Sequence, residues 1–428
     1  MTNILRRIVR NLARLTIWRY RPGIIGVTGT VGKTSTKLAI KAVLERGRRV
    51  RASAGNLNNE FGMPLAILGG WSEDELKLVS RAQPAGTARG RKIIFWLRVV
   101  FGSLWRVVFK DSQYPEILVL EYGADRPGDI KRLLKIARPN ISIITAVGDI
   151  PVHVEFYAGP DEVAREKGRL IEYLPAAGAA ILNYDDESVM NLEQRTRARV
   201  MTFGFNKGAE VKVSRLENRM EGERPVGISF KLEYKGAYVP VRLNDVFGRS
   251  HAYAAAAAAA VGLTFGMNLL TISEALANYA SPASRMHLLP GVKNTFIIDD
   301  SYNASPLSMH AALDALRDLP AKRKVAVLGD MLEIGKYTIE AHEAIGKLAA
   351  ESANILVTVG PRAKFIAEAA KAVGGAAGRI KKNAIISFDT ADEARKPIQD
   401  LIKQGDIILI KASHAVALDK IVEEIRAF

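Results

Sequence analysis

The 428-residue sequence has no cysteine and only six histidines. Without cysteine there can be no disulfide framework, zinc–thiolate site, iron–sulfur cluster or thiol nucleophile. With so few histidines, a metal site must rely mostly on oxygen ligands. Hydrophobic residues make up 48% of the chain and charged residues 25%, as in globular proteins. At about 100–200 residues per domain, this length predicts two to four domains.

Acidic residues are absent from two stretches that hold most of the net charge of +16. Residues 1–22 contain six arginines, and residues 76–110 contain eight arginines and lysines. The remainder of the chain is nearly neutral, unlike a protein coated evenly for nucleic acid, so no nucleic-acid partner is expected. Two local basic segments instead predict a local anionic partner, such as a membrane surface.

The same two stretches are also apolar. In residues 4–18, apolar side chains recur at helical spacing at Ile4, Ile8, Leu12 and Leu15. Residues 93–109 are long enough for a short membrane span, but Arg98 and Arg106 interrupt them, so no transmembrane helix is predicted. No signal peptide is predicted at the N-terminus either. Two interpretations stay open: an amphipathic anchor lying in a membrane surface through 1–22 and 93–109, or two helices packed on the protein body.

From residue 23 onward, apolar strands alternate with helices, which is typical of a parallel sheet covered by helices. Strands are expected at 24–29, 117–124, 141–148 and 179–186, and helices at 33–46, 127–138 and 160–173. Residues 209–244 alternate with period two and predict antiparallel strands. An alanine-rich helix is expected at 252–263. A second alternating unit follows, with strands expected at 295–301, 324–331, 354–360, 384–389 and 406–413.

The sequence therefore predicts an α/β fold with two main domains. Residues 1–22 form a basic amphipathic segment. Residues 23–284 form a central domain, with a mostly parallel sheet, a small antiparallel part and a basic, apolar insertion at about 72–113; the motifs below identify it as the ATP-binding domain. Residues 285–428 form a Rossmann-like C-terminal domain.

The strongest motif is Gly29-Thr30-Val31-Gly32-Lys33-Thr34, between a predicted strand and a predicted helix. Glycines let backbone N–H groups turn toward phosphate oxygens, and the helix N-terminus adds positive potential. Lys33 would neutralise phosphate charge and Thr34 would hold Mg²⁺. The strict pattern requires a further glycine where Val27 stands. The predicted nucleotide contacts are Gly29, Thr30, Gly32, Lys33, Thr34 and Ser35.

Three other residues could carry chemistry. Glu121 ends a predicted strand, where ligand crevices form in doubly wound sheets, and could bind a metal or merely cap a helix. His153 follows another strand at the same edge of the sheet, or is an ordinary loop histidine. Lys167 lies in the next predicted helix and, taken alone, is typical of a solvated surface lysine.

In this order the motifs resemble those of the Mur ligase family, from about residue 24 to the C-terminus. Within it, the chain is most similar to the type that adds D-alanyl-D-alanine to UDP-N-acetylmuramoyl-tripeptide. IIDDSYNASPLSM (297–309) and VLGDMLEIG (327–335) are the most specific motifs. The resemblance also rests on the segments 28–37, 56–65, 120–130, 145–153, 163–170, 183–187 and 408–414.

The resemblance implies an ATP-dependent ligase that forms a peptide (amide) bond. ATP phosphorylates a carboxylate of a cell-wall-type peptide precursor, and the amine of an amino acid or dipeptide attacks the acyl phosphate. Lys33, Lys167 and His153 are then the catalytic residues. Thr34 and Glu121 match ligands of a first Mg²⁺, and His153 matches a ligand of a second. Lys167 matches a lysine that family members carry as a carbamate, which also holds the second metal.

Further roles are implied residue by residue. Asn183, Arg285 and Asp299 match nucleotide-side positions. Eight residues match positions that meet substrate: Asn58, Asn59, Tyr302, Asn303, His342, Lys411, Ser413 and His414.

Four positions depart from the family pattern. Lys33 lies too near the start of the chain for a UDP-binding N-terminal domain of the usual size, so that domain is expected to be absent. Ala254 stands where family members have an asparagine near adenine. Ser305 replaces an asparagine. His414 replaces an arginine, and a histidine cannot clamp a carboxylate with two hydrogen bonds.

These departures leave alternatives. The acceptor could be a nucleotide-free or lipid-linked peptide at the membrane surface, or the enzyme could resemble folylpolyglutamate synthase. A non-catalytic ATP-binding partner protein is a third possibility. The expected location is the cytoplasm, with peripheral attachment to the inner face of the membrane as the further hypothesis.

Overall fold

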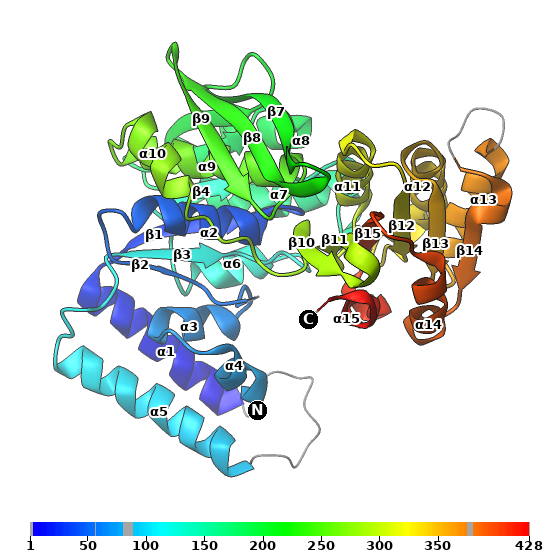
Figure 1. Cartoon of the computed structure of the whole chain (residues 1–428). Coiled ribbons are helices and arrows are strands. Elements are labelled where there is room, and N and C mark those ends of the chain that lie inside the picture. The colour runs from blue at the N-terminus through cyan, green and yellow to red at the C-terminus, as the bar shows by residue number, and fades with distance from the viewer. Residues whose placement is uncertain (1–2, 56, 80–88, 375–379, 428) are drawn as a thin grey trace.

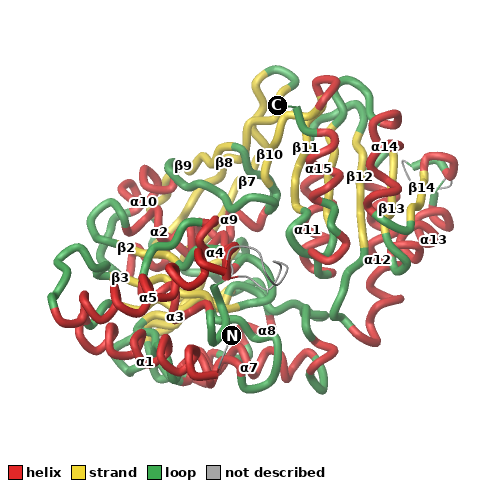
Figure 2. The backbone as a smooth tube through the Cα atoms, turned by 90° about the horizontal axis from the view of Figure 1, so that it is seen from below, coloured by secondary structure: helices red, strands yellow, loops and turns green. Residues whose placement is uncertain are grey.

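A computed structural model describes residues 3–55, 57–79, 89–374 and 380–427. Parts of the segments 1–22, 56–65 and 72–113 singled out above therefore lie outside the described residues. Two sheets organise the chain, and Figures 1 and 2 show them side by side. The α/β class is confirmed, because one sheet is large and mostly parallel and a second sheet follows it.

The large sheet has nine strands in the order β2-β3-β1-β4-β5-β6-β7-β8-β9. Its parallel strands are β1 (Gly23–Thr28), β2 (Val50–Ala52), β3 (Ile117–Glu121), β4 (Ile141–Ile144), β5 (Ala179–Asn183) and β6 (Arg199–Gly204). The predicted antiparallel part consists of β7 (Val211–Glu221), β8 (Arg224–Tyr234) and β9 (Ala237–Asn244). Its helices are α2 (Lys33–Leu44), α6 (Asp129–Leu134), α7 (Pro160–Glu172), α8 (Glu187–Met190), α9 (Arg249–Thr264) and α10 (Leu269–Leu276).

The second sheet has six strands in the order β10-β11-β15-β12-β13-β14. The strands are β10 (His287–Gly291), β11 (Thr295–Asp300), β12 (Lys324–Gly329), β13 (Ile355–Val359), β14 (Ile385–Phe388) and β15 (Ile407–Lys411). Only β10 is antiparallel to its neighbour. In Figure 1 one face carries α11 (Pro306–Asp318), α12 (Thr338–Ser352) and α13 (Ala363–Val373), and the other carries α14 (Ala391–Leu401) and α15 (Asp419–Ile425).

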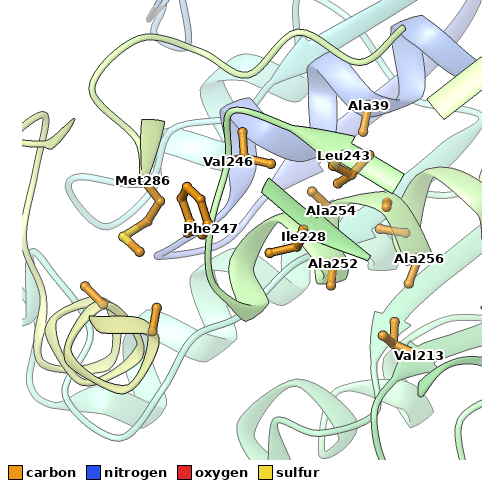
Figure 3. Packing of buried hydrophobic residues seen from close by; sticks show 14 of the residues in the cluster. Ala39, Val213, Ile228, Leu243, Val246, Phe247, Ala252, Ala254, Ala256 and Met286 are labelled. Carbon is orange, nitrogen blue, oxygen red and sulfur yellow. The ribbon is translucent and has the colours of Figure 1, made fainter. Parts of the chain in front are cut away.

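The core of the large sheet is built around the alanine run of α9. Ala254 to Ala260 are all at most 1% exposed, and α9 packs against α2 on one side and the strands on the other. Figure 3 shows Ala252, Ala254 and Ala256 among larger side chains from the strands. A run of alanines lets backbones approach closely.

A short ladder joins the two sheets. Val246 bridges His287, and Phe247 donates its N–H to the Met286 carbonyl at 3.2 Å. The side chains of Phe247 and Met286 lie together in Figure 3. The segment that enters β10 is therefore attached to the large sheet before it joins the small one.

A separate helical layer covers one side of the large sheet. It comprises α1 (Asn3–Tyr20), α3 (Gly62–Leu68), α4 (Glu73–Val79) and α5 (Arg89–Val108). The predicted apolar stripe of α1 needs correction, because Leu12 is buried while Ile4, Ile8 and Leu15 are exposed. The buried side of α1 consists of Val9, Leu12, Ala13 and Thr16, which share a face at spacings of three and four. No described helix is long and apolar enough to cross a membrane.

Candidate active site

The glycine loop (residues 29–34) connects β1 to α2 at the carboxyl edge of the large sheet. Gly32 has φ +86°, and a Cβ on Gly29 would lie 2.0 Å from Thr145 Oγ1, so both positions require glycine. The Lys33 ammonium donates to the Gly29 carbonyl at 2.6 Å. Thr30 Oγ1 is buried without a partner among the described residues. A tight loop with an unpaired hydroxyl at a helix N-terminus fits a phosphate ligand.

Glu121 ends β3 beside this loop, and its carboxylate is only 1% exposed. Lys37, one turn into α2, is equally buried and lies 2.7 Å from Glu121 Oε1. Burial alone would raise the pKa of Glu121, but the Lys37 ammonium outweighs it and holds the pKa below its usual value. Lys37 is not among the residues predicted from the sequence, where its only signal is a lysine on the apolar side of a helix.

Lys167 is almost completely buried, at 2% exposure on the inner face of α7. Burial, together with the nearby positive charge of Lys33, lowers the pKa of Lys167 to about 7. A buried amine with a pKa near neutrality is largely available as a nucleophile at physiological pH. This environment excludes the solvated surface lysine as an interpretation.

His153 lies between the part of the chain built on the large sheet and the part built on the second sheet. Its Nε2 lies 3.3 Å from Asp125 of the large-sheet part, and its Nδ1 lies 2.6 Å from Glu333, which follows β12. Burial lowers the pKa of His153, and the two carboxylates oppose that shift. Glu333 has φ +62°, an unfavourable backbone conformation that holds its carboxylate toward His153. Neither Asp125 nor Glu333 was singled out from the sequence.

The second part contributes Arg285, Tyr302, Asn303 and Lys411. The Arg285 guanidinium stacks 4.2 Å above the ring of Tyr302. Lys411 Nζ lies 2.6 Å from Asp300 Oδ2 and donates to the Asn303 carbonyl at 2.8 Å. These groups place two cations opposite the glycine loop.

The nucleotide-side position Asn183 has a structural task as well. Its side-chain amide donates to the Thr145 carbonyl at 2.7 Å, which fixes the loop that faces the glycine loop. Beside it, the Tyr253 hydroxyl donates to Asp185 at 2.7 Å, and Arg249 stacks 4.0 Å above Phe205. The fully buried Ala254 does not line this region, whereas Tyr253 and Arg249 do.

One cavity of about 1000 Å³ gathers most of the predicted residues. Of the predicted set, it is lined by Gly29, Thr30, Gly32, Lys33, Thr34, Ser35, Asn58, Asn59, Glu121, His153, Lys167, Asn183, Arg285, Tyr302, Asn303 and Lys411. Asn58 reaches it because the Gly123 N–H donates to the Asn58 carbonyl at 2.9 Å. Residues distant in sequence thus converge where the carboxyl ends of strands meet.

Four predicted residues do not line the cavity. Asp299 accepts hydrogen bonds from Ser284 and Ser301. His342 is completely buried and accepts the Met331 N–H at 3.0 Å. Ser413 accepts the Leu332 N–H at 2.9 Å, so it and His342 both shape the loop that carries Glu333. His414 is exposed and stacks on Tyr302 with 5.8 Å between ring centres.

The protein side chains alone do not complete a metal site. Among the described residues no group of three or more His, Asp or Glu side chains could hold a metal ion. Mg²⁺ commonly takes one or two protein ligands and completes its shell with water and phosphate oxygens. Thr34 and Glu121, both lining the cavity beside the glycine loop, fit that pattern.

Comparison with known proteins agrees with this architecture. Residues 106–262 match the Mur ligase middle domain and residues 284–414 match the Mur ligase, glutamate ligase domain. The UDP-N-acetylmuramoyl-tripeptide–D-alanyl-D-alanine ligase of Mycobacterium bovis is 30% identical over 94% of this chain and 73% of its own length.

Solved structures give the same picture. The MurF ligase of Thermotoga maritima in complex with ADP superposes with a TM-score of 0.77 at 25% identity, over 98% of this chain and 83% of that one. Folylpolyglutamate synthase of Mycobacterium tuberculosis shares the fold, with a TM-score of 0.66 at 18% identity over 97% and 94%.

The fold and the cavity define an ATP-dependent ligase that forms amide bonds. More specifically, the chain belongs to the Mur ligase family, with MurF-type ligases among its relatives.

The contact between Glu333 and His153 gives a first prediction. Glu333→Gln should lower kcat/KM about 10- to 100-fold, because the sequence predicts His153 as a metal ligand and groups that orient a ligating histidine typically contribute that much. ADP binding should stay within about twofold, since Glu333 does not touch the glycine loop. The matched control is Glu351→Gln, an exposed glutamate of α12. Steady-state kinetics and ADP titration measure both effects, and unchanged kcat/KM in Glu333→Gln would contradict this role.

Proposed function

We propose that this enzyme joins an amino acid or a dipeptide such as D-alanyl-D-alanine to the peptide of a UDP-N-acetylmuramoyl-tripeptide-like precursor. The observation that carries the proposal is the single cavity in which the glycine loop, Lys167 and His153 face Asn303 and Lys411. Phosphoryl transfer and amine attack need these groups on opposite sides of one site. The relatives' names supply the substrate class.

The cavity's own residues have distinct tasks in this reaction. The N–H groups of the glycine loop and the Lys33 ammonium hold the phosphates of ATP and balance the charge that develops as the γ-phosphoryl group moves to the acceptor carboxylate. Arg285 and Lys411, on the far wall, stabilise the acyl phosphate and the oxyanion formed when the amine attacks it. Closure of the two parts over the cavity excludes water, which would otherwise hydrolyse the acyl phosphate.

Two Mg²⁺ sites are part of the proposal. Thr34 and Glu121 would hold a first ion, and His153 with Lys167 a second. Bound there, Mg²⁺ neutralises charge on the phosphates and the acceptor carboxylate. Lys167 can serve only as an anionic carbamate, and its burial beside Lys33 supports that form, because a carbamate replaces a repulsive ammonium with a favourable partner.

A second candidate concerns the acceptor and the added amine. The departure at His414, which stacks on Tyr302, favours an amine other than D-alanyl-D-alanine. The exposed apolar and basic surface of α1 and α5 favours an acceptor presented at a membrane, as a lipid-linked or nucleotide-free peptide.

One experiment separates these candidates. Purified protein is incubated with ATP, Mg²⁺, UDP-N-acetylmuramoyl-tripeptide and D-alanyl-D-alanine, phosphate release is followed, and products are identified by mass. An amide product establishes the proposed substrates. ATP binding without product excludes them, and the same assay with lipid-linked acceptors and other amines then tests the second candidate.

A further inference from the structure

The outward sides of α1 and α5 expose an unusual amount of apolar surface. Twelve of the nineteen large hydrophobic side chains exposed among the described residues lie on these two helices or directly after α5. We name this surface the outer face; it comprises Ile4, Ile8, Leu15, Trp18, Ile93, Ile94, Leu97, Phe101, Leu104, Trp105, Val108 and Phe109. Contiguous exposed apolar patches of this kind mark interaction sites.

Helix α5 is apolar on both sides. Phe95, Val99 and Ser103, spaced four apart, are buried against the body. The opposite side is mostly apolar, with Ile94, Phe101 and Trp105 66%, 63% and 65% exposed. It carries one exposed arginine, Arg98, which pairs with Glu75 of α4. Of the two arginines that interrupt this segment, Arg106 turns inward and donates to the Leu68 carbonyl. An ordinary surface helix would carry polar residues on its outer side, so packing on this chain does not explain the pattern.

Helix α1 continues the same surface. Trp18 is 66% exposed and Ile4 is 69% exposed, on a side next to the exposed residues Arg7, Arg10 and Arg14. The Tyr20 hydroxyl donates to the Arg106 carbonyl at 2.6 Å, and Arg19 donates to the Val107 carbonyl at 3.1 Å. These bonds tie the last turns of the two helices together, and Figure 1 shows the two helices side by side. Trp18 and Trp105 therefore lie at the same end of the outer face.

The charges around the outer face indicate which kind of partner binds there. Neither α1 nor α5 contains an acidic residue, and both carry several arginines. A second copy of the chain would bring two predominantly basic surfaces together, which is unfavourable. An anionic lipid surface offers hydrocarbon for the apolar side chains and phosphate for the arginines. Exposed tryptophans at one end suit the boundary between the two.

We infer that the outer face docks the enzyme on an anionic lipid bilayer, with α1 and α5 lying in the plane of the interface. The absence of a membrane-crossing helix among the described residues agrees with an in-plane position. The inference goes beyond the proposed function, because docking would hold whichever amide the enzyme forms. Since ATP is the energy source, the bilayer surface is the cytoplasmic one.

The helical layer also connects the bilayer to the cavity. Asn59 lines the cavity, and its side-chain oxygen accepts the Gly62 N–H at 2.8 Å at the start of α3. Helix α3 packs directly on α1 and α5. Docking would thus hold the Asn58–Asn59 rim of the cavity one helix away from the lipid.

The test measures co-sedimentation of the full-length protein with large vesicles of phosphatidylcholine, alone or mixed with phosphatidylglycerol. We expect binding to the mixed vesicles and about tenfold weaker binding to phosphatidylcholine alone. The variant Phe101→Ser/Trp105→Ser should bind the mixed vesicles at least about tenfold more weakly, because it removes inserted apolar area. The control Tyr238→Ser/Leu270→Ser changes side chains of similar exposure, 62% and 63%, elsewhere on the surface, and should bind as the unchanged protein does.

A second measurement reports insertion directly. Lipids brominated in their acyl chains should quench the tryptophan fluorescence of the unchanged protein and leave that of Trp18→Ser/Trp105→Ser unquenched. Equal ADP binding by all variants shows that they are folded. Absence of binding to mixed vesicles overturns the inference, as does unaltered binding by Phe101→Ser/Trp105→Ser. A dimer that this variant dissociates, without any vesicle binding, would assign the outer face to a second copy instead.

Discussion

Replacing Lys33 by alanine should lower ATP-dependent product formation by at least about 10²- to 10³-fold, because removing one preorganised charge from a transition-state site costs that much. Lys33 is the cation at the base of the glycine loop, where its ammonium binds the Gly29 carbonyl. Burial lowers the pKa of Lys33, and the charge of Glu121 opposes that shift. A cation in so poorly solvated a place interacts strongly with the phosphate that is transferred.

The matched control is Lys41→Ala. Lys41 lies two turns further along α2, is 41% exposed and pairs only with Glu45 at 3.4 Å, so its loss should leave the rate within about twofold. Phosphate release with identified products measures turnover, and circular dichroism verifies folding. Near-normal turnover in a folded Lys33→Ala variant would remove the glycine loop from the mechanism. Loss of turnover in both variants would point to damage of α2 instead.

Replacing Lys167 should be nearly as severe. We expect Lys167→Ala to lose at least about 100-fold in kcat, because under the proposed function the Lys167 carbamate would hold the second Mg²⁺, and a bound metal ion supplies several kcal/mol of charge stabilisation. The expectation rests on the burial of Lys167 at 2% exposure, which no solvated lysine would show. Arg165→Ala, an exposed neighbour on the same helix, should retain activity within about twofold.

The carbamate can be measured apart from activity. Protein equilibrated with ¹³C-labelled bicarbonate should show a carbamate carbon resonance that is absent in Lys167→Ala and present in Arg165→Ala. Removal of dissolved CO₂ should lower the activity of the unchanged enzyme, and added bicarbonate should restore it. An inactive Lys167→Ala variant without a carbamate signal in the parent protein would mean that the free amine, not its carbamate, is required.

Much of the site could be predicted from the sequence because, in a parallel sheet, residues at the carboxyl ends of different strands meet at one edge of the sheet. Glu121 and His153 both follow parallel strands, so their convergence on the glycine loop follows from strand direction alone. No comparable rule predicts which residues of the second sheet will contact residues of the first across the cavity. Glu333 reaches His153 through a left-handed backbone conformation, and nothing in its sequence spacing indicates that contact.

Other residues matched a motif yet face away from the cavity. His342 and Ser413 hold the loop after β12 by accepting its N–H groups, which a motif match cannot distinguish from substrate contact. The faces of α1 were ambiguous for a different reason. Apolar residues occupy two sides of that helix, and periodicity alone does not say which side is buried, so Leu12 was placed with Ile4 and Ile8 although it points inward.

The alanine run of α9 sets how closely this helix packs against α2, the helix that follows the glycine loop. Helix α2, which begins at Lys33, packs against α9, and α9 packs against the strands. The side chains of Ala254 to Ala260 lie buried in these contacts. Close-packed interiors transmit small changes of volume. Helix α2 also packs directly on β1, β2 and β3. The seven alanines, which lie outside the cavity, therefore fix how closely α9 approaches α2, and a larger side chain among them would displace the helix that begins at Lys33.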